Sequence, residues 1–467
     1  MSIVPKILLV YPPISKFERY GGSLGFFGGN QIPLGIFLLA SYLMEKGIEV
    51  HAIDAEARRM KPEEITQLMK EDGYNVLGIS ATTVAFHRAL ELAKHAKETS
   101  PEVITILGGP HVSTSPAQPL EYDAFDFAVR NEGEETLVEL LRCMEVDGSH
   151  EEISGLSYRK DGEVKVNPAR NYIEDLDTLP FPAYDMIPDI TIYSPPPFNY
   201  KKKPVVNIIT SRGCPFKCTF CETTTFGRKV RMRSAENIVD EIQHVIEKYG
   251  AREIAFVDDT FTVQPKRIYE IFKLAKQRGL EFPWSCMSRV DTVDEALLEF
   301  MSQSGCWYVA LGIESGDEGI LKRIKKNIKF SQVEKVVTKC HDLGVVTKGF
   351  FMIGHPGETV ETIEKTIKYA KSILLDHVVV TINTPMPGSE QYRTVDSFGS
   401  LDESGWTKYN MWNPVFTPTG LSKEIMLSLQ KKFIRSFYLQ PRVILRNLRI
   451  LLLKFNFWSK APFLGGK

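Results

Sequence analysis

Short apolar runs alternate with amphipathic stretches along residues 1–150. The runs are K-I-L-L-V-Y from residue 6, I-F-L-L-A-S-Y-L from 36, I-E-V-H-A-I-D from 48, V-L-G-I-S-A from 76, V-I-T-I-L-G-G from 103 and D-F-A-V-R from 126. Strands that alternate with helical patterns favour βαβ units and a parallel sheet. With about five such strands, the pattern predicts one doubly wound, Rossmann-like α/β domain whose ligand lies beyond the carboxyl ends of the strands.

The pattern changes over residues 151–200. The segment G-L-S-Y-R-K-D-G-E-V-K-V predicts a β-hairpin that turns at Asp161 and Gly162, because Asp-Gly favours a two-residue turn. A proline-rich passage follows, with T-L-P-F-P-A-Y and S-P-P-P-F. We therefore expect a linker with little fold of its own in this range.

A second alternation of strand and helix patterns occupies residues 201–395. Its six runs are V-V-N-I-I-T from residue 205, E-I-A-F-V-D-D from 253, W-S-C-M-S-R from 284, W-Y-V-A-L-G-I-E from 307, V-V-T-K-G-F-F-M-I-G from 345 and H-V-V-V-T-I-N from 377. These units predict a partial (β/α)6 barrel, incomplete relative to the full barrel. Its chemistry should lie at the carboxyl ends of the strands, where Cys214, Asp258, Glu314 and His355 fall.

Residues 396–467 lack this alternation and end in aromatic and basic helical patterns, so we expect a mainly helical C-terminal extension. The stretch V-I-L-R-N-L-R-I-L-L-L-K-F-N-F-W from residue 443 is too short and too charged to span a bilayer. Two interpretations of it stay open. The helix packs across the barrel with its arginine stems along apolar surface, or it lies on a membrane surface.

Composition sets limits on the class of protein. A chain of 467 residues is too long for one hydrophobic core, and 43% hydrophobic with 25% charged residues is typical of globular proteins. The formal net charge of −1 gives no electrostatic ground for binding nucleic acid, so we expect no such partner. The odd number of cysteines, seven, and an N-terminus without a secretory pattern predict a reducing, cytoplasmic setting.

Three of the seven cysteines crowd into the segment C-P-F-K-C-T-F-C, at Cys214, Cys218 and Cys221. A structural zinc site would need a fourth ligand, and the other cysteines show no second paired spacing. Inert buried thiols are a second interpretation, although Lys217, Thr219 and Glu222 make a polar setting for them. The third is a four-iron cluster held through three irons, which leaves one iron open to a small molecule.

This segment resembles the C-x3-C-x-aromatic-C signature of the radical S-adenosylmethionine superfamily. The resemblance implies a [4Fe-4S] cluster on Cys214, Cys218 and Cys221, with S-adenosylmethionine bound to the open iron. It also implies that the reduced cluster cleaves S-adenosylmethionine to a 5′-deoxyadenosyl radical, and that a reductant such as flavodoxin or ferredoxin supplies the electron. The position of the signature, after the first strand of a six-unit barrel, strengthens the match.

The resemblance extends to other strand ends of the barrel. It implies that S-adenosylmethionine contacts Phe220, Asp258, Asp259, Arg289, Glu314 and Gly354. For the acids, the alternative is a solvated loop charge or a helix cap, where Asp and Glu are favoured in any case. For Arg289, the alternative is a structural ion pair. Cys286 and Cys306 lie inside apolar runs and are expected in the core.

The first domain lacks two common ligand motifs. No G-x-G-x-x-G follows its first strand, which argues against a dinucleotide site, and that strand ends at Tyr11 rather than in the aspartates of a phosphoacceptor domain. Small residues follow two other strands, in S-A-T-T from residue 80 and L-G-G-P-H-V-S from residue 107. Such residues let a flat or extended ligand approach the backbone. Turn glycines without a ligand are the alternative.

These segments, with P-L-G-I-F-L-L-A-S-Y-L near residue 33 and R-N-E-G-E-E-T-L near residue 130, resemble the cobalamin-binding domain of one radical S-adenosylmethionine class. The resemblance implies cobalamin contacts at Ser80, Thr82, Gly108 and Gly109. The D-x-H-x-x-G motif of other cobalamin domains is missing, because Y-P-P-I-S-K-F-E-R-Y has no histidine. We therefore expect no histidine on the lower face of the cobalt, and His51 and His111 lie in the wrong local context.

The resemblance thus implies an enzyme with three cofactors: the cluster, S-adenosylmethionine and cobalamin. We expect it to methylate an unactivated carbon of a hydrophobic small molecule, lipid-like or tetrapyrrole. An oxidative cyclase of the tetrapyrrole type, like Mg-protoporphyrin monomethyl ester cyclase, is the alternative within enzymes. A non-catalytic, metal-stabilised binding protein is the alternative from another class. Membrane contact through the C-terminal segment would suit a lipid-like substrate.

Overall fold

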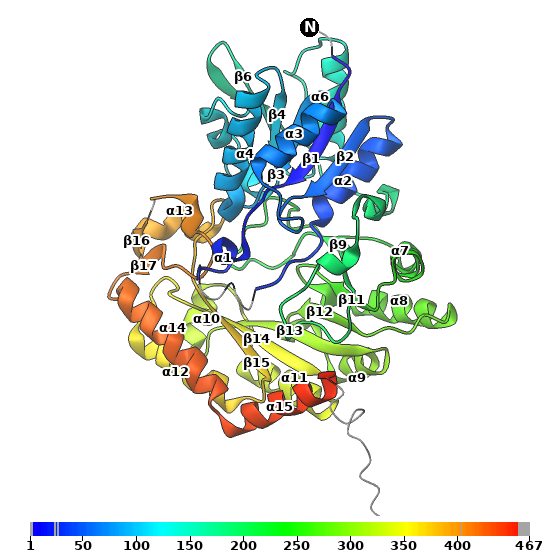
Figure 1. Cartoon of the computed structure of the whole chain (residues 1–467). Coiled ribbons are helices and arrows are strands. Elements are labelled where there is room, and N and C mark those ends of the chain that lie inside the picture. Colours follow the sequence, from blue (N-terminus) through cyan, green and yellow to red (C-terminus); the bar gives the residue numbers. More distant parts are fainter. Residues whose placement is uncertain (1–2, 23–24, 26–27, 403, 456–467) are drawn as a thin grey trace, which may run out of the picture.

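The computed structural model describes residues 3–22, 25, 28–402 and 404–455. Two α/β bodies lie one above the other, with the N-terminal body at the top of Figure 1 and the barrel below it. The C-terminal helices follow the outer side of the barrel.

The first body is built on a seven-stranded sheet with the order β2-β1-β3-β4-β5-β6-β7. Five strands pair in parallel: β1 (Lys6–Tyr11), β2 (Glu49–Asp54), β3 (Val76–Ser80), β4 (Ile104–Gly108) and β5 (Phe127–Val129). The order changes direction between β1 and β3, which is the switch point where doubly wound sheets bind ligands. The predicted doubly wound fold is confirmed.

Alternate side chains of β1 explain why helices cover both faces of this sheet. Ile7 and Leu9 belong to one core, and Leu8 and Val10 to the other. The helices on the first face are α2 (Leu34–Glu45) and α6 (Glu134–Glu145). Those on the second are α3 (Pro62–Asp72) and α4 (Phe86–Thr99). A strand that is apolar at every position is therefore buried on both sides.

The predicted hairpin forms, with strands β6 (Leu156–Lys160) and β7 (Glu163–Val166). Asp161 and Gly162 both adopt positive φ, at 52° and 79°, which suits a tight turn. The hairpin does not belong to an unstructured linker, because β6 pairs antiparallel with β5 and so extends the first sheet. The apolar side chains of Leu156 and Tyr158 join the core of that sheet, a signal that the proline-rich surroundings obscured.

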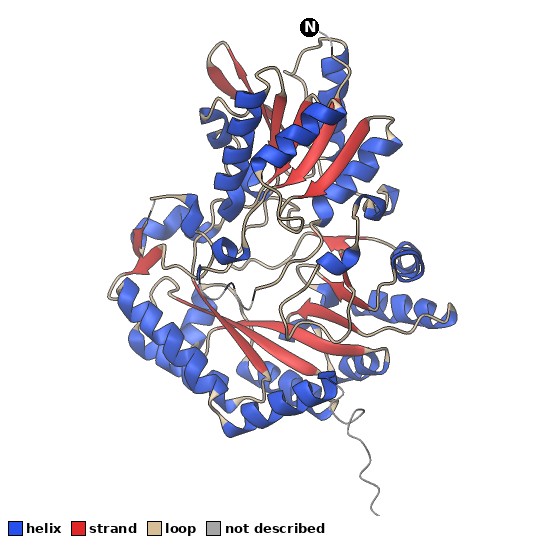
Figure 2. Cartoon of the chain, viewed as in Figure 1, coloured by secondary structure: helices blue, strands red, loops and turns tan. Residues whose placement is uncertain are grey.

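The second body is a parallel six-stranded sheet with the order β15-β14-β13-β12-β11-β8. Its strands are β8 (Val205–Ile208), β11 (Glu253–Phe256), β12 (Trp284–Ser288), β13 (Cys306–Glu314), β14 (Val346–Ile353) and β15 (His377–Ile382). The helices between them are α7 (Ala235–Tyr249), α8 (Pro265–Gln277), α9 (Glu295–Gln303), α10 (Glu318–Arg323), α11 (Phe330–Asp342) and α12 (Val360–Ser372). The predicted six-unit partial barrel is confirmed (Figure 2).

The C-terminal extension contains helices α14 (Lys423–Tyr438) and α15 (Pro441–Phe455) after a small hairpin of β16 (Gly399–Leu401) and β17 (Phe416–Pro418). Phe433 and Phe437 of α14 are fully buried in the barrel core. On α15, Val443 is buried, whereas Leu445 is 67% exposed. Among the described residues, no helix is long and apolar enough to cross a bilayer. Membrane contact stays a prediction.

Candidate active site and cofactor pockets

The three clustered cysteines lie on one loop, residues 213–227, which we call the cysteine loop. It leaves the barrel through β9 (Ser211–Arg212) and returns through β10 (Arg231–Met232), and these two short strands pair antiparallel. The amide of Cys214 donates to the carbonyl of Gly227 at 3.3 Å, and the amide of Thr219 to that of Ile324 at 3.0 Å. The loop is thus held at both its base and its middle.

All three cysteines line one cavity of about 200 Å³ at the carboxyl ends of the barrel strands. Its other walls come from the cysteine loop, from β11, β12, β13, β14 and the residues that follow them, and from the segment after α10, with Phe216, Phe220, Glu222, Thr223, Asp259, Thr260, Met287, Ser288, Arg289, Ala310, Gly312, Glu314, Lys326 and Phe350. Among the described residues, no three His, Cys, Asp or Glu side chains are grouped to hold a single metal ion. Thiols spread around a cavity suit a cluster, in which each cysteine binds a different iron.

Cations beside Cys218 favour its thiolate, the form that binds metal. The hydrogen bond from the Cys221 thiol lowers the pKa of Cys218 against the effect of burial, and Lys326 and Arg289 act in the same direction. The Arg289 guanidinium lies 3.6 Å from the Cys218 sulfur and 3.7 Å from the centre of the Phe216 ring. The donor set and its charge therefore fit an iron–sulfur cluster.

Arg289 combines the two interpretations that the sequence left open. Its guanidinium forms an ion pair with Asp291 at 2.8 Å and donates to the carbonyl of Lys326 at 2.8 Å. The same side chain lines the cysteine cavity. It is therefore a structural ion-pair partner and a neighbour of Cys218 at once.

Glu314 ends β13 in a conformation that strands rarely contain. Its φ is 69°, in the left-handed region, and the pairing of β13 with β14 shifts register between Gly312 and Glu314. Such an irregularity redirects a side chain toward a site, and the unusual backbone conformation costs about 1–3 kcal/mol. The Glu314 carboxylate receives a bond from the Lys326 ammonium at 3.0 Å, and only 7% of Glu314 and 5% of Lys326 are exposed.

Lys326 was not singled out from the sequence. It lies in K-R-I-K-K-N-I-K, from residue 322, where the neighbouring lysines are exposed and Lys326 alone turns inward. A buried acid at a strand end needs a counter-ion, and that requirement is the signal that could have found a nearby base. The buried pair offers both a cation and an anion to the amino and carboxylate groups of an amino-acid ligand.

Replacing Lys326 with alanine is expected to lower the free energy of unfolding by about 3–5 kcal/mol, because it leaves the buried carboxylate of Glu314 without its partner. Lys325→Ala is the matched control: its ammonium pairs with Glu390 on the surface and is worth at most about 1 kcal/mol. Urea unfolding of the three proteins measures the difference. Equal destabilisation by the two substitutions would show that the Glu314 pair has no special weight.

The two adjacent aspartates point to opposite sides, as successive residues of an extended chain do. Asp258 is fully buried and accepts hydrogen bonds from the backbone amide of Thr210 at 3.1 Å, from the Thr210 hydroxyl at 2.8 Å and from Ser211. It therefore holds the end of β8 and does not line the cavity. Asp259 does line it, and burial, with Asp258 and Glu222 nearby, raises the pKa of Asp259.

Phe220 and Gly354 lie near the carboxyl end of β14. The Phe220 ring is 5.8 Å from the imidazole of His355, centre to centre, and Phe220 lines the cysteine cavity. Gly354 adopts a φ of 84°, donates its amide to the carboxylate of Glu358 at 2.5 Å and is not among the lining residues. The structure thus brings together the candidates of the barrel except Asp258, Gly354 and His355, which do not line the cavity.

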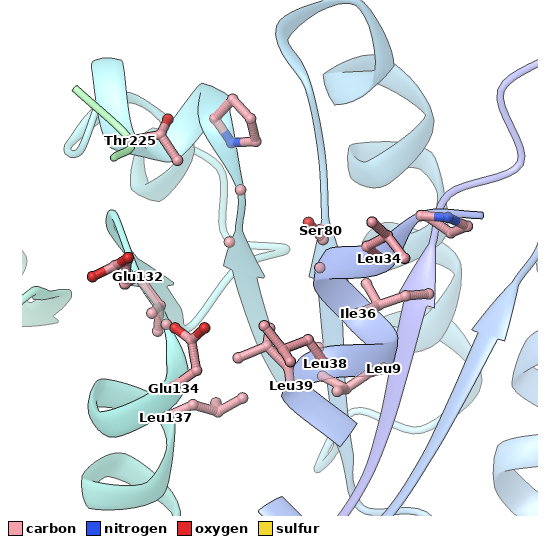
Figure 3. Close-up of a pocket in the computed structure, with 18 of the residues that line it drawn as sticks. Leu9, Leu34, Ile36, Leu38, Leu39, Ser80, Glu132, Glu134, Leu137 and Thr225 are labelled. Carbon is pink, nitrogen blue, oxygen red and sulfur yellow. The ribbon is translucent and has the colours of Figure 1, made fainter. Parts of the chain in front are cut away.

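A second cavity, of about 300 Å³, lies at the carboxyl ends of the strands of the first sheet (Figure 3). The four candidates Ser80, Thr82, Gly108 and Gly109 all line it. Its walls are largely apolar, with Leu9, Leu34, Ile36, Leu38, Leu39, Ile79, Ile106, Val129 and Leu137. This site was found from small residues at strand ends, and its apolar walls suit a flat aromatic ring system.

The backbone around Gly109 has no room for a side chain. Its φ is 95°, and an added Cβ would lie 2.8 Å from the carbonyl oxygen of Ala81. At Gly108 the nearest atom to an added Cβ is the carbonyl oxygen of Val129 at 3.7 Å, so that space is left to the cavity. The two glycines together form a cradle that a nucleotide-like group could approach closely, which fits cobalamin.

Neither His51 nor His111, the two histidines considered as cobalt ligands from the sequence, lines this cavity. His111 is fully buried, and its ring lies 4.3 Å from the Phe86 ring, centre to centre, with the two planes tilted by 34°. It contacts the Gln118 amide oxygen at 3.0 Å, and burial lowers its pKa to about 4. His51 lies on β2 and is half-buried.

Residues of the barrel complete the wall of the second cavity. Arg212, Thr225 and Phe226, which flank the cysteines in sequence, line it together with Glu132 and Glu134 of the first domain. Sequence reasoning included Glu132 and Glu134 only within the segment R-N-E-G-E-E-T-L and missed the three barrel residues, because contacts between two domains cannot be read from the sequence of either domain alone. The two cavities therefore lie on either side of one short stretch of chain.

Comparison with known proteins agrees with this geometry. The model of the radical SAM superfamily matches residues 208–370, and the model of the B12 binding domain matches residues 24–141. An uncharacterized methyltransferase, PH0819, of Pyrococcus horikoshii is 36% identical over 95% of the chain and 95% of its own length. The anaerobic magnesium-protoporphyrin IX monomethyl ester cyclase of Rubrivivax gelatinosus is 27% identical over 93% of the chain and 77% of its own length.

Among solved structures, the fold resembles that of the cobalamin-dependent S-adenosylmethionine radical enzyme OxsB with aqua-cobalamin and S-adenosylmethionine bound. The two chains superpose with a TM-score of 0.76 at 18% identity, over 97% of this chain and 72% of OxsB. This likeness concerns the arrangement of the two bodies and their sheets.

Proposed function

Because the chain belongs to the radical S-adenosylmethionine superfamily and carries a B12-binding domain, we propose that it methylates an unactivated carbon of a small, largely apolar molecule. Its cofactors are a [4Fe-4S] cluster, S-adenosylmethionine and cobalamin. When bound, these cofactors supply two things: an electron that cleaves S-adenosylmethionine to a 5′-deoxyadenosyl radical, and a methyl group for transfer. Because this superfamily consists of enzymes, the alternative of a non-catalytic, metal-stabilised binding protein does not hold.

One observation carries the proposal: a single stretch of chain reaches both cavities. Cys214, Cys218 and Cys221 line the cysteine cavity, and Arg212, Thr225 and Phe226 on either side of them line the second cavity, which we call the cobalamin-type cavity. A radical formed beside the cysteines and a methyl donor in the first domain would then meet one substrate between the two bodies. Methyl transfer also fits the name of the methyltransferase relative from Pyrococcus horikoshii.

The proposed roles of the chain's own residues follow from their positions. Cys214, Cys218 and Cys221 hold the cluster, while Lys326 and Glu314 bind the carboxylate and amino groups of S-adenosylmethionine. Asp259 accepts from the same amino group. On the barrel side of the cavity, Met287, Ala310 and Phe350 keep water from the reacting carbon, and their apolar character supports a substrate without charge at that point.

Oxidative cyclisation of a tetrapyrrole is the second candidate, and the similarity to the Rubrivivax cyclase over 93% of the chain favours it. Both reactions begin with the same radical, so the residues around the cysteines fit either. They differ in whether the product gains a carbon.

The test begins with anaerobically purified protein, reconstituted with iron and sulfide. About four irons per chain and 5′-deoxyadenosine formed from S-adenosylmethionine with dithionite are the expected results. A full cluster that yields no deoxyadenosine contradicts the radical mechanism. Cells that carry the gene or lack it, fed methyl-deuterated methionine, are then compared by mass spectrometry of lipids and small metabolites. A gene-dependent product that carries the deuterated methyl supports methylation, and one without it supports cyclisation.

A further inference from the structure

One segment of the first domain, residues 130–134, contacts the cysteine loop on both sides of the cysteines. The carboxylate of Glu134 accepts from the guanidinium of Arg212 at 2.6 Å, two residues before Cys214. The side-chain amide of Asn131 donates to the carbonyl of Thr224 at 2.8 Å, three residues after Cys221. We call these contacts, with those of Glu132, the interdomain clamp.

Glu132 is the centre of the clamp. Its carboxylate accepts from Arg212 at 2.7 Å, from Arg231 at 2.8 Å and from the backbone amide of Ile173 at 2.7 Å. The first domain, the proline-rich linker and the two strands that carry the cysteine loop therefore meet at one side chain. A displacement of any of the three segments would break at least one of these bonds.

The clamp is buried and electrically balanced. The side chains of Glu132, Glu134, Arg212 and Arg231 are only 2–6% exposed, and two carboxylates face two guanidiniums. Burial works to lower the pKa of Arg212, and the carboxylates of Glu134 and Glu132 more than offset it and raise that pKa. Arg212 therefore stays charged at neutral pH, and its directional bonds to the two carboxylates stay in place.

The geometry of each contact is restrictive. The fork of Arg212 bridges two different carboxylates, which a flexible ammonium cannot do with the same precision. The Arg231 guanidinium also lies 4.8 Å from the centre of the Tyr172 ring, and the Tyr172 hydroxyl donates to the carbonyl of Thr224 at 2.7 Å. Asn131 adopts a φ of 58°, a left-handed conformation that asparagine tolerates better than most residues.

Such a network is not needed merely to hold the two domains together. Apolar side chains of similar volume often stabilise a buried contact as much as an ion pair does, or more. The same residues also form the wall of the cobalamin-type cavity, where Figure 3 shows Glu132 and Glu134 beside Leu137. The clamp thus joins the wall of one cofactor site directly to the loop that holds the other.

We propose that Asn131, Glu132, Glu134 and Arg212 are positioning residues that set the distance and orientation between the cobalamin site and the cysteine loop. The inference rests on the proposed function, because it assumes that both cofactors are bound. Reactions between held groups lose about 100-fold in rate when a contact shifts by about 1 Å, so a directional clamp has a purpose that an apolar interface would not serve.

The separation of the two cofactors can be measured without knowing the substrate. In protein loaded with cob(II)alamin and a dithionite-reduced cluster, both centres carry an unpaired electron. The cluster speeds the relaxation of the cobalamin spin, an effect that falls steeply with distance and is read by pulsed electron paramagnetic resonance. We compare the native protein with Arg212→Lys, which keeps the charge but loses the fork, and with Asn131→Ala on the other side of the loop.

Both variants are expected to lose most of the relaxation enhancement when it is compared at equal cobalt and iron content. The control is Arg233→Lys. Arg233 is a half-buried arginine that pairs with Glu241 within the barrel, so its substitution should leave the enhancement unchanged.

Unchanged enhancement in Asn131→Ala and Arg212→Lys overturns the inference, and so does loss of cobalamin or cluster from both. If Arg212→Lys fails to fold, Asn131→Ala decides. If the native protein shows no cob(II)alamin signal or no signal from the reduced cluster, the proposed function itself is contradicted, and the inference falls with it.

Discussion

Replacing Cys218 with alanine is expected to abolish the formation of 5′-deoxyadenosine and to leave cobalamin binding intact. Cys218 is 5% exposed and lines the cysteine cavity with Cys214 and Cys221, so two thiolates remain for a cluster that needs three. Loss of a residue that only supports a metal ligand already costs about 10–100-fold, and loss of a ligand should exceed that. Iron analysis, deoxyadenosine by mass spectrometry and cobalamin absorbance measure the three quantities.

Cys143→Ala is the control for this substitution, because Cys143 is a half-buried cysteine of α6 that lines neither cavity. It should retain iron, deoxyadenosine formation and cobalamin. A Cys218→Ala protein that still makes deoxyadenosine at the native rate contradicts the assignment of the cluster. Parallel loss of cobalamin from Cys218→Ala would instead mean that the two cofactor sites do not load independently.

Replacing Gly108 with valine is expected to give the reverse result, with cobalamin lost and the cluster retained. An added Cβ at Gly108 meets no protein atom closer than 3.7 Å, so the new side chain can occupy the cavity without disturbing the strand. Overpacking of a filled site costs about 1–3 kcal/mol, which weakens cobalamin binding by about 5- to 150-fold. Absorbance titration of the anaerobic protein measures the dissociation constant.

The neighbouring glycine provides the contrast. Gly109→Ala places a Cβ 2.8 Å from a backbone oxygen, at a φ of 95°, and should therefore destabilise the folded first domain itself. The left-handed conformation alone costs about 1–2 kcal/mol for an alanine. Thermal unfolding separates the two variants: Gly108→Val should melt as the native protein does and Gly109→Ala earlier. Native cobalamin affinity in Gly108→Val contradicts the assignment of this cavity.

Hydrophobic patterning was sufficient to predict the two sheets. Runs that are apolar at every position, such as Ile7 to Val10, are buried on both faces and indicate parallel strands between helices. The cysteine spacing was sufficient to predict that Cys214, Cys218 and Cys221 lie together, because residues within one short segment depend little on the rest of the fold for their proximity. Strand ends then located Asp259, Arg289 and Glu314 in the same cavity.

Patterning could not decide which of two adjacent acids faces the cavity. Asp258 and Asp259 are equivalent in sequence, and only the hydrogen bonds from Thr210 and Ser211 turn Asp258 away. Lys326 and Arg212 were missed for a related reason. Each is one basic residue among several, and its role depends on a buried acid supplied by another strand or another domain.

The hairpin of β6 and β7 affects how molecules of this protein meet one another. Without it, β5 would end the first sheet as an open edge, and unpaired amides and carbonyls on such an edge readily bind a strand of another chain. The hairpin occupies that edge and replaces it with β7, which carries the charged side chains of Glu163 and Lys165. Charges on an edge strand oppose pairing, so the hairpin protects the chain against aggregation through this sheet.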